Sequence, residues 1–80
     1  MRWVFKKNTE NDNIIEIGYS HNNDDCDGII IYDKKLQILN IKKYSDGCDE
    51  YDSKRAFQFI YGLLEEDNVL TFKKHIICTG

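Results

Sequence analysis

The sequence predicts an α+β domain: a four-stranded antiparallel meander followed by one helix packed on a sheet face and by a fifth strand (β-β-β-β-α-β). The first half of the chain holds four short apolar segments, and the connections between them are too short for a crossover helix. Apolar residues at helical spacing follow, and then a last apolar run. No linker or repeat divides the 80 residues, so we expect one domain over residues 1–80.

The four strands of the meander are predicted from β-branched and aromatic residues. In the second segment Ile15, Ile17 and Tyr19 alternate along one face, as expected for a half-buried strand. The third segment, IIIYD, is apolar at consecutive positions, which is typical of a central strand. The predicted strands are residues 2–7, 14–20, 29–33 and 36–44.

The fourth predicted strand, 36–44, combines two phases of hydrophobic alternation. Leu36 and Ile38 share one parity, whereas Leu39 and Ile41 share the other. Because side chains alternate between the two faces of a sheet, one regular strand cannot bury all four residues on one face. A bulge near residues 38–39, or burial of both faces, would reconcile the two phases.

A helix is predicted over residues 53–66 and a fifth strand over residues 69–78. Asp52 or Ser53 is the expected cap, because either side chain can accept from the free N–H groups of the first turn. The apolar residues recur at i, i+3, i+4 and i+7, which places them on one helical face. These residues are Ala56, Phe59, Ile60 and Leu63. The sequence leaves open whether the fifth strand pairs with the first strand or with the fourth.

Composition and charge narrow the classes of function. With 41% hydrophobic and 31% charged residues, the chain is typical of an ordered soluble domain. Its apolar runs are far shorter than the ~20 residues of a membrane span, and MRWVFKK at the start does not resemble a signal peptide. A net charge of −3 is unfavourable for phosphate binding. We therefore expect a cytoplasmic protein with no nucleic-acid or membrane partner.

The eight residues HNNDDCDG, at 21–28, raise the question of a cation site. The calcium-loop pattern D-x-[DN]-x-[DN]-G-x5-E requires a bidentate glutamate, and Lys34 stands in its place, which excludes a high-affinity loop of this type. Weak cation binding by the loop aspartates stays open. We interpret the segment as a turn, with Asx-turns and a positive φ at Gly28. The residues aligned with the pattern are Asn23, Asp25, Asp27 and Gly28.

A zinc site is the alternative hypothesis. Three cysteines fit a reducing compartment better than a disulfide framework, and with two histidines they provide enough ligands for zinc. No C-x2-C pair is present, and in a strand His75 and Cys78 would point to opposite faces. The candidate ligands are His21, Cys26, Cys48, His75 and Cys78.

The sequence does not predict an enzyme or a cofactor. Cys48 with His21 or His75 is the only conceivable pair of nucleophile and base, and no known signature surrounds that cysteine. The acidic residues of CDEYD, at 48–52, would raise the pKa of the Cys48 thiol and so reduce its reactivity.

Aromatic side chains and the exposed sheet face favour an interaction protein. Because one helix covers one face of a five-stranded sheet, the other face is solvated or is covered by a second subunit or a partner. We therefore predict a small acidic protein-interaction module that binds a protein partner or forms a homodimer. Its size, its charge and its many residues of the types that AT-rich codons encode suit an inhibitor or accessory protein of a bacterial mobile element. The predicted partner-binding residues are Trp3, Phe5, Tyr32, Phe57 and Tyr61.

Overall fold

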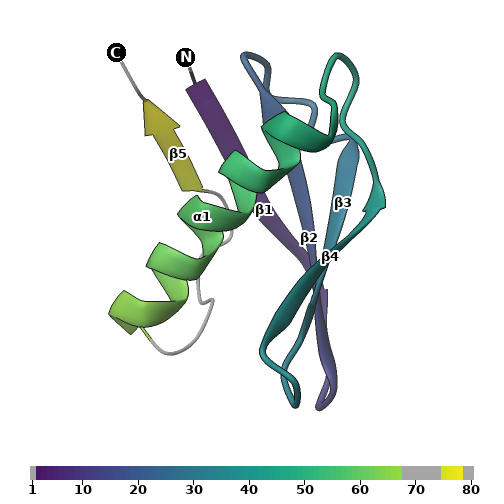
Figure 1. The fold of residues 1–80 in the computed structure, drawn as a ribbon, viewed down its shortest axis with the longest axis vertical. Helices are drawn as coiled ribbons and strands as arrows, with labels where there is room; N and C mark the ends of the chain where they lie inside the picture. Colours follow the sequence, from purple (N-terminus) through teal and green to yellow (C-terminus); the bar gives the residue numbers. More distant parts are fainter. Residues whose placement is uncertain (1, 68–74, 79–80) are drawn as a thin grey trace.

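The computed structural model describes residues 2–67 and 75–78 and confirms the α+β class (Figure 1). Four antiparallel strands form a meander, and the helix that follows crosses one face of the sheet. The elements are β1 (Arg2–Glu10), β2 (Ile14–His21), β3 (Gly28–Asp33), β4 (Ile38–Lys43), α1 (Glu50–Asp67) and β5 (His75–Cys78).

The strand order in the sheet is β4-β3-β2-β1-β5. β5 pairs antiparallel with β1, from Arg2 opposite Cys78 to Phe5 opposite His75, which answers the open question about its neighbour. The first part of the predicted fifth strand, residues 69–74, lies outside the described residues. Among the described strands β4 lies at one edge of the sheet, next to β3.

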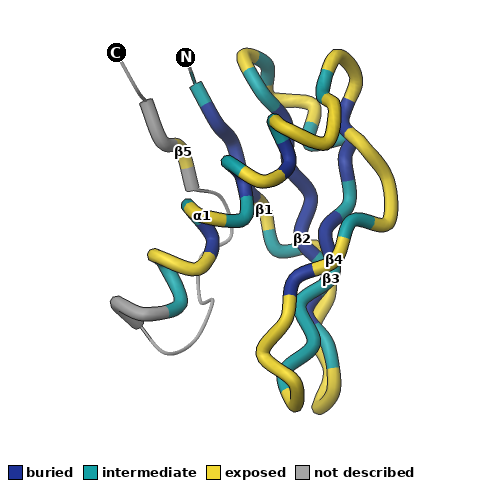
Figure 2. Tube along the Cα trace, viewed as in Figure 1, coloured by how far each residue is buried: buried dark blue, intermediate teal, exposed yellow. Residues whose placement is uncertain are grey.

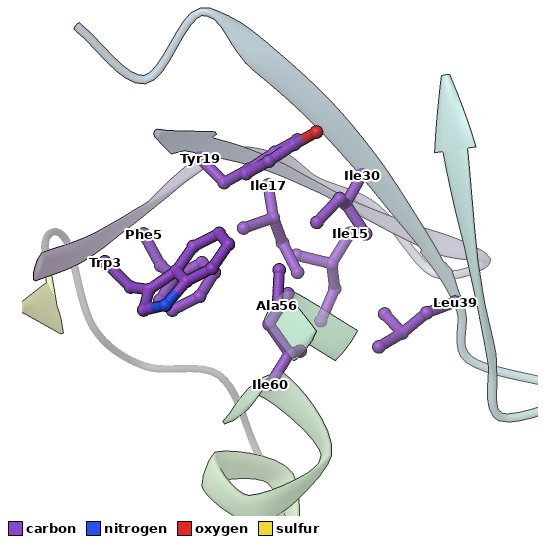
Figure 3. Packing of buried hydrophobic residues seen from close by; sticks show 9 residues of the cluster. All are labelled: Trp3, Phe5, Ile15, Ile17, Tyr19, Ile30, Leu39, Ala56 and Ile60. Atoms are coloured by element: carbon purple, nitrogen blue, oxygen red, sulfur yellow. The ribbon is translucent and has the colours of Figure 1, made fainter. Parts of the chain in front are cut away.

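The core lies between the sheet and α1, on what we call the front face; the opposite face is the back face. Paired residues share a face, so the pairing of Ile15 with Tyr32 and of Tyr32 with Leu39 aligns one buried row across three strands. Figure 2 shows the buried strand segments in dark blue, with exposed hairpin tips below them. The core residues in Figure 3 are Trp3, Phe5, Ile15, Ile17, Tyr19, Ile30, Leu39, Ala56 and Ile60.

The predicted strand 36–44 is shorter in the structure. β4 begins at Ile38, because Asp33 closes a turn before it: its Oδ1 accepts the N–H groups of Lys35 and Leu36, both at 2.9 Å. Gln37 then adopts a φ of 58°, in the left-handed region. The chain therefore enters β4 as Ile38, and Leu36 belongs to the turn.

Neither explanation offered for the two hydrophobic phases of this segment is correct. Leu39 and Ile41 face the core, whereas Ile38 remains 45% exposed on the back face. The irregular pairing lies at Lys42 instead, since Ile30 pairs with Ile41 and the preceding Ile29 pairs with Lys43. The strand thus buries one phase and exposes the other.

The first hairpin is longer than predicted, because β1 continues to Glu10 instead of ending at Lys7. Asn8 is the extra residue of a bulge, after which Thr9 and Glu10 pair again with β2. Asn11 closes the turn, since its Oδ1 accepts hydrogen bonds from the N–H of Asn13 at 2.8 Å and from the N–H of Ile14, the first residue of β2, at 2.9 Å.

The helix begins at Glu50, three residues before the predicted start, and its cap is Asp49 instead of Asp52 or Ser53. Asp49 Oδ1 accepts the N–H of Asp52 at 3.0 Å, while Asp52 Oδ2 accepts the N–H of Asp49 at 3.3 Å. This reciprocal pair is a capping box in which an aspartate replaces the usual Glu or Gln. The N–H of Asp52 also keeps the pKa of Asp49 below its usual range.

Asp49→Ala should lower the free energy of unfolding, because it leaves an N-terminal N–H of α1 without its acceptor. Urea unfolding followed by the fluorescence of Trp3, the one tryptophan of the chain, measures this difference. Asp46→Ala, which removes the same charge from the same loop, is the matched control. Asp49→Asn should retain most of the stability, and equal losses in the two alanine variants would contradict the cap.

Carboxylates with lowered pKa values connect separate elements of the fold. Glu10 bonds Lys34 at 2.6 Å and Lys7 at 2.8 Å, which lowers the pKa of Glu10 to about 2 and links β1 to the turn before β4. Asp27 accepts the hydroxyl of Ser45 at 2.6 Å and the N–H of Asp46 at 3.0 Å, and its pKa is also lowered.

These depressed pKa values predict acid destabilisation. Groups with a pKa lower in the folded than in the unfolded chain add stability above their unfolded pKa of about 4, and that stability is lost as the pH falls towards the folded pKa. The urea concentration at the midpoint of unfolding should therefore decrease as the pH is lowered from about 4 to about 2. Glu10→Gln should reduce this dependence while lowering the midpoint at neutral pH. A midpoint that stays constant over this range would refute the prediction.

Candidate functional site

The structure divides the five predicted partner-binding residues between core and surface. Trp3 and Phe5 are fully buried under α1, so the prediction that they contact a partner is wrong for this conformation. Their large apolar rings fill the core of a small domain, which is the ordinary role of such side chains. Tyr32 and Phe57 are half-buried and pack against the core, while Tyr61 is 39% exposed.

His21 belongs to the same aromatic layer as Trp3. The two rings stack with centroids 4.2 Å apart and an angle of 17° between their planes. Phe59 of α1 also lies close to Trp3, with ring centroids 6.0 Å apart and an angle of 50° between the ring planes. Within the described part of the chain, neither His21 Nε2 nor Trp3 Nε1 has a hydrogen-bond partner.

The polar loop between β2 and β3 forms turns, as predicted. Asn23 Oδ1 accepts the N–H of Asp25 at 2.9 Å, which is an Asx-turn. The predicted positive φ at Gly28 is wrong, because the left-handed residues are Asn22 and Cys26, with φ of 65° and 49°. Gly28 is required for another reason: a Cβ there would collide with the ring of Tyr19 and lie 2.7 Å from the backbone N of Ser45.

The loop aspartates are directed to separate partners. Asp24 forms an ion pair with Arg2 at 2.7 Å, and Asp27 binds Ser45 and Asp46. Among the side chains that the structure describes, those of residues 2–64 and of Ile76, no three of His, Cys, Asp or Glu group closely enough to hold a metal ion.

The described members of the proposed zinc set lie apart. His21 faces the front, where it stacks on Trp3. Cys26 lies on the back, where Ser20 Oγ approaches its sulfur at 3.9 Å. The structure describes the backbone of His75 and Cys78 but not their side chains. The structure therefore does not bring His21, Cys26 and Cys48 together into a metal centre.

Cys48 is half-buried beside the core. Burial raises the pKa of the Cys48 thiol above its usual range, and the neighbouring carboxylate of Asp52 raises it further. The direction confirms the effect expected from the acidic sequence, and the structure adds burial as the larger cause. Cys48 is accordingly a protonated thiol at neutral pH, which disfavours its use as a nucleophile.

Cys48 should react with iodoacetamide more slowly than free cysteine near pH 7, in a chain that carries Cys26→Ser and Cys78→Ser so that only one thiol is counted. Mass spectrometry over time measures the rate. Asp52→Asn should accelerate the reaction, because it removes a negative charge that disfavours the thiolate. Lys54→Gln, on the same helix, is the control. Alkylation faster than that of free cysteine would reopen a thiolate mechanism.

A different surface emerges along the edge strand β4. Six large hydrophobic side chains are exposed within the described residues, and four of them lie around this strand. Leu36, 65% exposed, precedes β4 and Ile38 begins it; Tyr44, 46% exposed, follows it. Tyr61 of α1 reaches the strand from the front. We call β4 together with Leu36, Tyr44 and Tyr61 the β4 edge surface.

Tyr61 occupies a backbone group of the open edge. The N–H of Leu39 donates to the Tyr61 hydroxyl at 3.1 Å, so it points away from β3. Hydrogen-bonded and non-hydrogen-bonded pairs alternate in an antiparallel ladder, and Leu39, Asn40 and Ile41 pair with β3 without interruption. The backbone groups of Leu39 and Ile41 are therefore directed outward, and Tyr61 covers one of them.

Lysine side chains surround the same edge. Lys42 and Lys43 end β4, and Lys35 lies in the turn before it; all three are exposed. Lys35 and Lys42 form no ion pair within the described ranges, while Lys43 acts on the carboxylate of Asp27 through space. The edge is thus locally positive in a chain with a net charge of −3.

Of the residues around β4, Tyr61 belongs to the partner-binding set predicted from the sequence, whereas Leu36, Ile38 and Tyr44 do not. A signal was present in the sequence, because Leu36 and Ile38 are out of phase with the core residues that follow them.

Within the described residues, no helix is both long and apolar enough to cross a membrane. No protein-family model, curated protein or solved structure matches the chain.

Proposed function

We propose that the protein is a protein-interaction module that binds its partner through the β4 edge surface. The observation that carries the proposal is that four of the six exposed large hydrophobic residues among the described ones lie along one edge strand; they are Leu36, Ile38, Tyr44 and Tyr61. Single exposed apolar residues are ordinary on a protein surface, whereas several along one strand edge favour an interaction site. Tyrosine adds to this argument, because its ring buries a large area at low entropic cost and its hydroxyl still finds a partner.

The edge provides polar recognition as well as apolar area. Leu39 and Ile41 direct main-chain donors and acceptors outward, and an added strand can pair with such groups. Residues that flank the edge would then contact the partner's side chains. A cytoplasmic location and a role as an inhibitor or accessory protein of a bacterial mobile element belong to this proposal, with small size, composition and charge as their support.

The proposal is tested by selecting binders from a random peptide library displayed on phage, with the whole chain immobilised. Peptides that use the β4 edge surface should bind Ile38→Lys at least about tenfold more weakly, because the substitution places a charge where an apolar contact forms. Fluorescence anisotropy of the selected peptides measures the affinities.

Ile76→Lys is the matched control. Ile76 is 48% exposed and Ile38 is 45% exposed. Both side chains lie on the back face, but they belong to the strands at the two opposite edges of the sheet, β5 and β4. The control should change the affinities less than about twofold. Failure to select any peptide, or equal binding of selected peptides to Ile38→Lys and the wild-type chain, would refute the proposed function.

A further inference from the structure

We propose that the partner presents an extended, acidic segment, which adds to β4 as a sixth strand and displaces the Tyr61 hydroxyl from the edge. This inference rests on the proposed function and specifies the chemistry of its partner. It combines the direction of the backbone groups along β4, the contact made by Tyr61, and the charge around the strand.

The backbone of β4 is suited to strand addition over a short length. Leu39 and Ile41 are two residues apart, and the backbone N–H and C=O groups of both point away from β3. This is the spacing at which an incoming strand exchanges pairs of N–H···O bonds. The irregular pairing at Lys42 limits the regular edge to the residues before it. A partner segment of about five to eight residues would cover this length, as is usual for one strand.

Tyr61 behaves as a removable cap on this edge. Its hydroxyl accepts the Leu39 N–H at 3.1 Å, which is the bond that a carbonyl of an added strand would form. The tyrosine is 39% exposed, so its ring can move towards solvent when the carbonyl arrives. In the free chain the cap satisfies a donor that would otherwise attract unrelated strands.

Charge selects the partner. Lys35, Lys42 and Lys43 surround the edge, and the first two have no carboxylate partner within the described residues. Glutamate or aspartate in an added strand would pair with them across the strands, whereas lysine or arginine would be repelled. The same lysines protect an edge against indiscriminate pairing, so protection and selectivity have one physical cause.

A second copy of the chain fits this edge less well than an acidic segment. In a symmetric dimer, the β4 strands of two copies would pair antiparallel. If Leu39 of one copy pairs with Ile41 of the other, the two-fold axis passes through Asn40. By the period of the ladder, Lys43 then lies opposite Gln37, in the neighbourhood of Lys35 of the other copy. Two groups of lysines would therefore be brought together in each dimer.

The experiment uses two blocked octapeptides with threonine and valine at alternate positions and either three glutamates or three lysines in place of threonine. Fluorescence anisotropy should show that the glutamate peptide binds the whole chain at least about tenfold more tightly than the lysine peptide, since each cross-strand charge pair contributes a modest amount. Amide exchange measured by NMR should slow at Leu39 and Ile41, which reports strand addition directly.

Charge reversal provides the decisive variant. Lys42→Glu together with Lys43→Glu should reverse the preference between the two peptides. Lys6→Glu together with Lys54→Glu changes the net charge equally at exposed positions away from β4 and should leave the preference intact. Tyr61→Phe should tighten glutamate-peptide binding by about three- to tenfold, because it removes the competing acceptor and keeps the ring. Tyr51→Phe, at the exposed start of α1, should have no effect.

Three results would overturn the inference. They are equal binding of the two peptides, a preference that the Lys42 and Lys43 variant does not reverse, and amide protection outside β4. A concentration-dependent dimer in native mass spectrometry that Tyr61→Phe strengthens would identify a second copy as the occupant and would also overturn it. Library peptides that depend on Ile38 but are neither acidic nor extended would refute this inference and leave the proposed function standing. Absence of any Ile38-dependent peptide would refute both.

Discussion

The contact between Tyr19 and Gly28 is the constraint on which the rest of the structure depends. The Tyr19 ring lies where a side chain at the paired Gly28 would be, and its buried hydroxyl accepts the N–H of Ser45 at 3.0 Å and lies 3.4 Å from Ser53 Oγ. One side chain thereby joins β2, β3, the loop after β4 and the first turns of α1. Asp27 supports the same junction through Ser45. A buried hydroxyl is costly without partners, so this network fixes the loop and the helix together.

The position of α1 follows from this junction and determines which part of the sheet stays open. Anchored at Ser53, the helix descends across β1 and β2, where Ala56 and Ile60 complete the core (Figures 1 and 3). It contacts the outer side of β4 through the Tyr61 hydroxyl, which accepts the N–H of Leu39. Because α1 is anchored near its N-terminal end, at Ser53, and crosses β1 and β2, it leaves the edge of β4 open. The lysines and the Tyr61 hydroxyl compensate for that opening.

The spacing of apolar residues and the runs of β-branched residues were sufficient to predict the four strands of the meander and the helix, although not where each element begins and ends. The details that depend on contacts distant in the sequence could not be predicted. Asp49 is one of several acids able to cap a helix, and the choice is made by where the Ser45 junction lets α1 begin. Gly28 resembles an ordinary turn glycine until the ring of Tyr19 is placed against it. The burial of Trp3 could not be predicted either, because composition alone does not distinguish a core aromatic from an interface aromatic.

The conflict of phase in residues 36–41 is the most informative sequence feature in retrospect. A strand that only had to fold would bury Leu39 and Ile41 and place polar residues at the alternating positions. This chain instead keeps an isoleucine exposed at the start of an edge strand, after an exposed leucine, although exposed apolar edges promote aggregation. Local rules are broken most often where function requires it. The unfavourable Ile38 therefore argues for a partner at β4 independently of the geometry of Tyr61 and of the lysines.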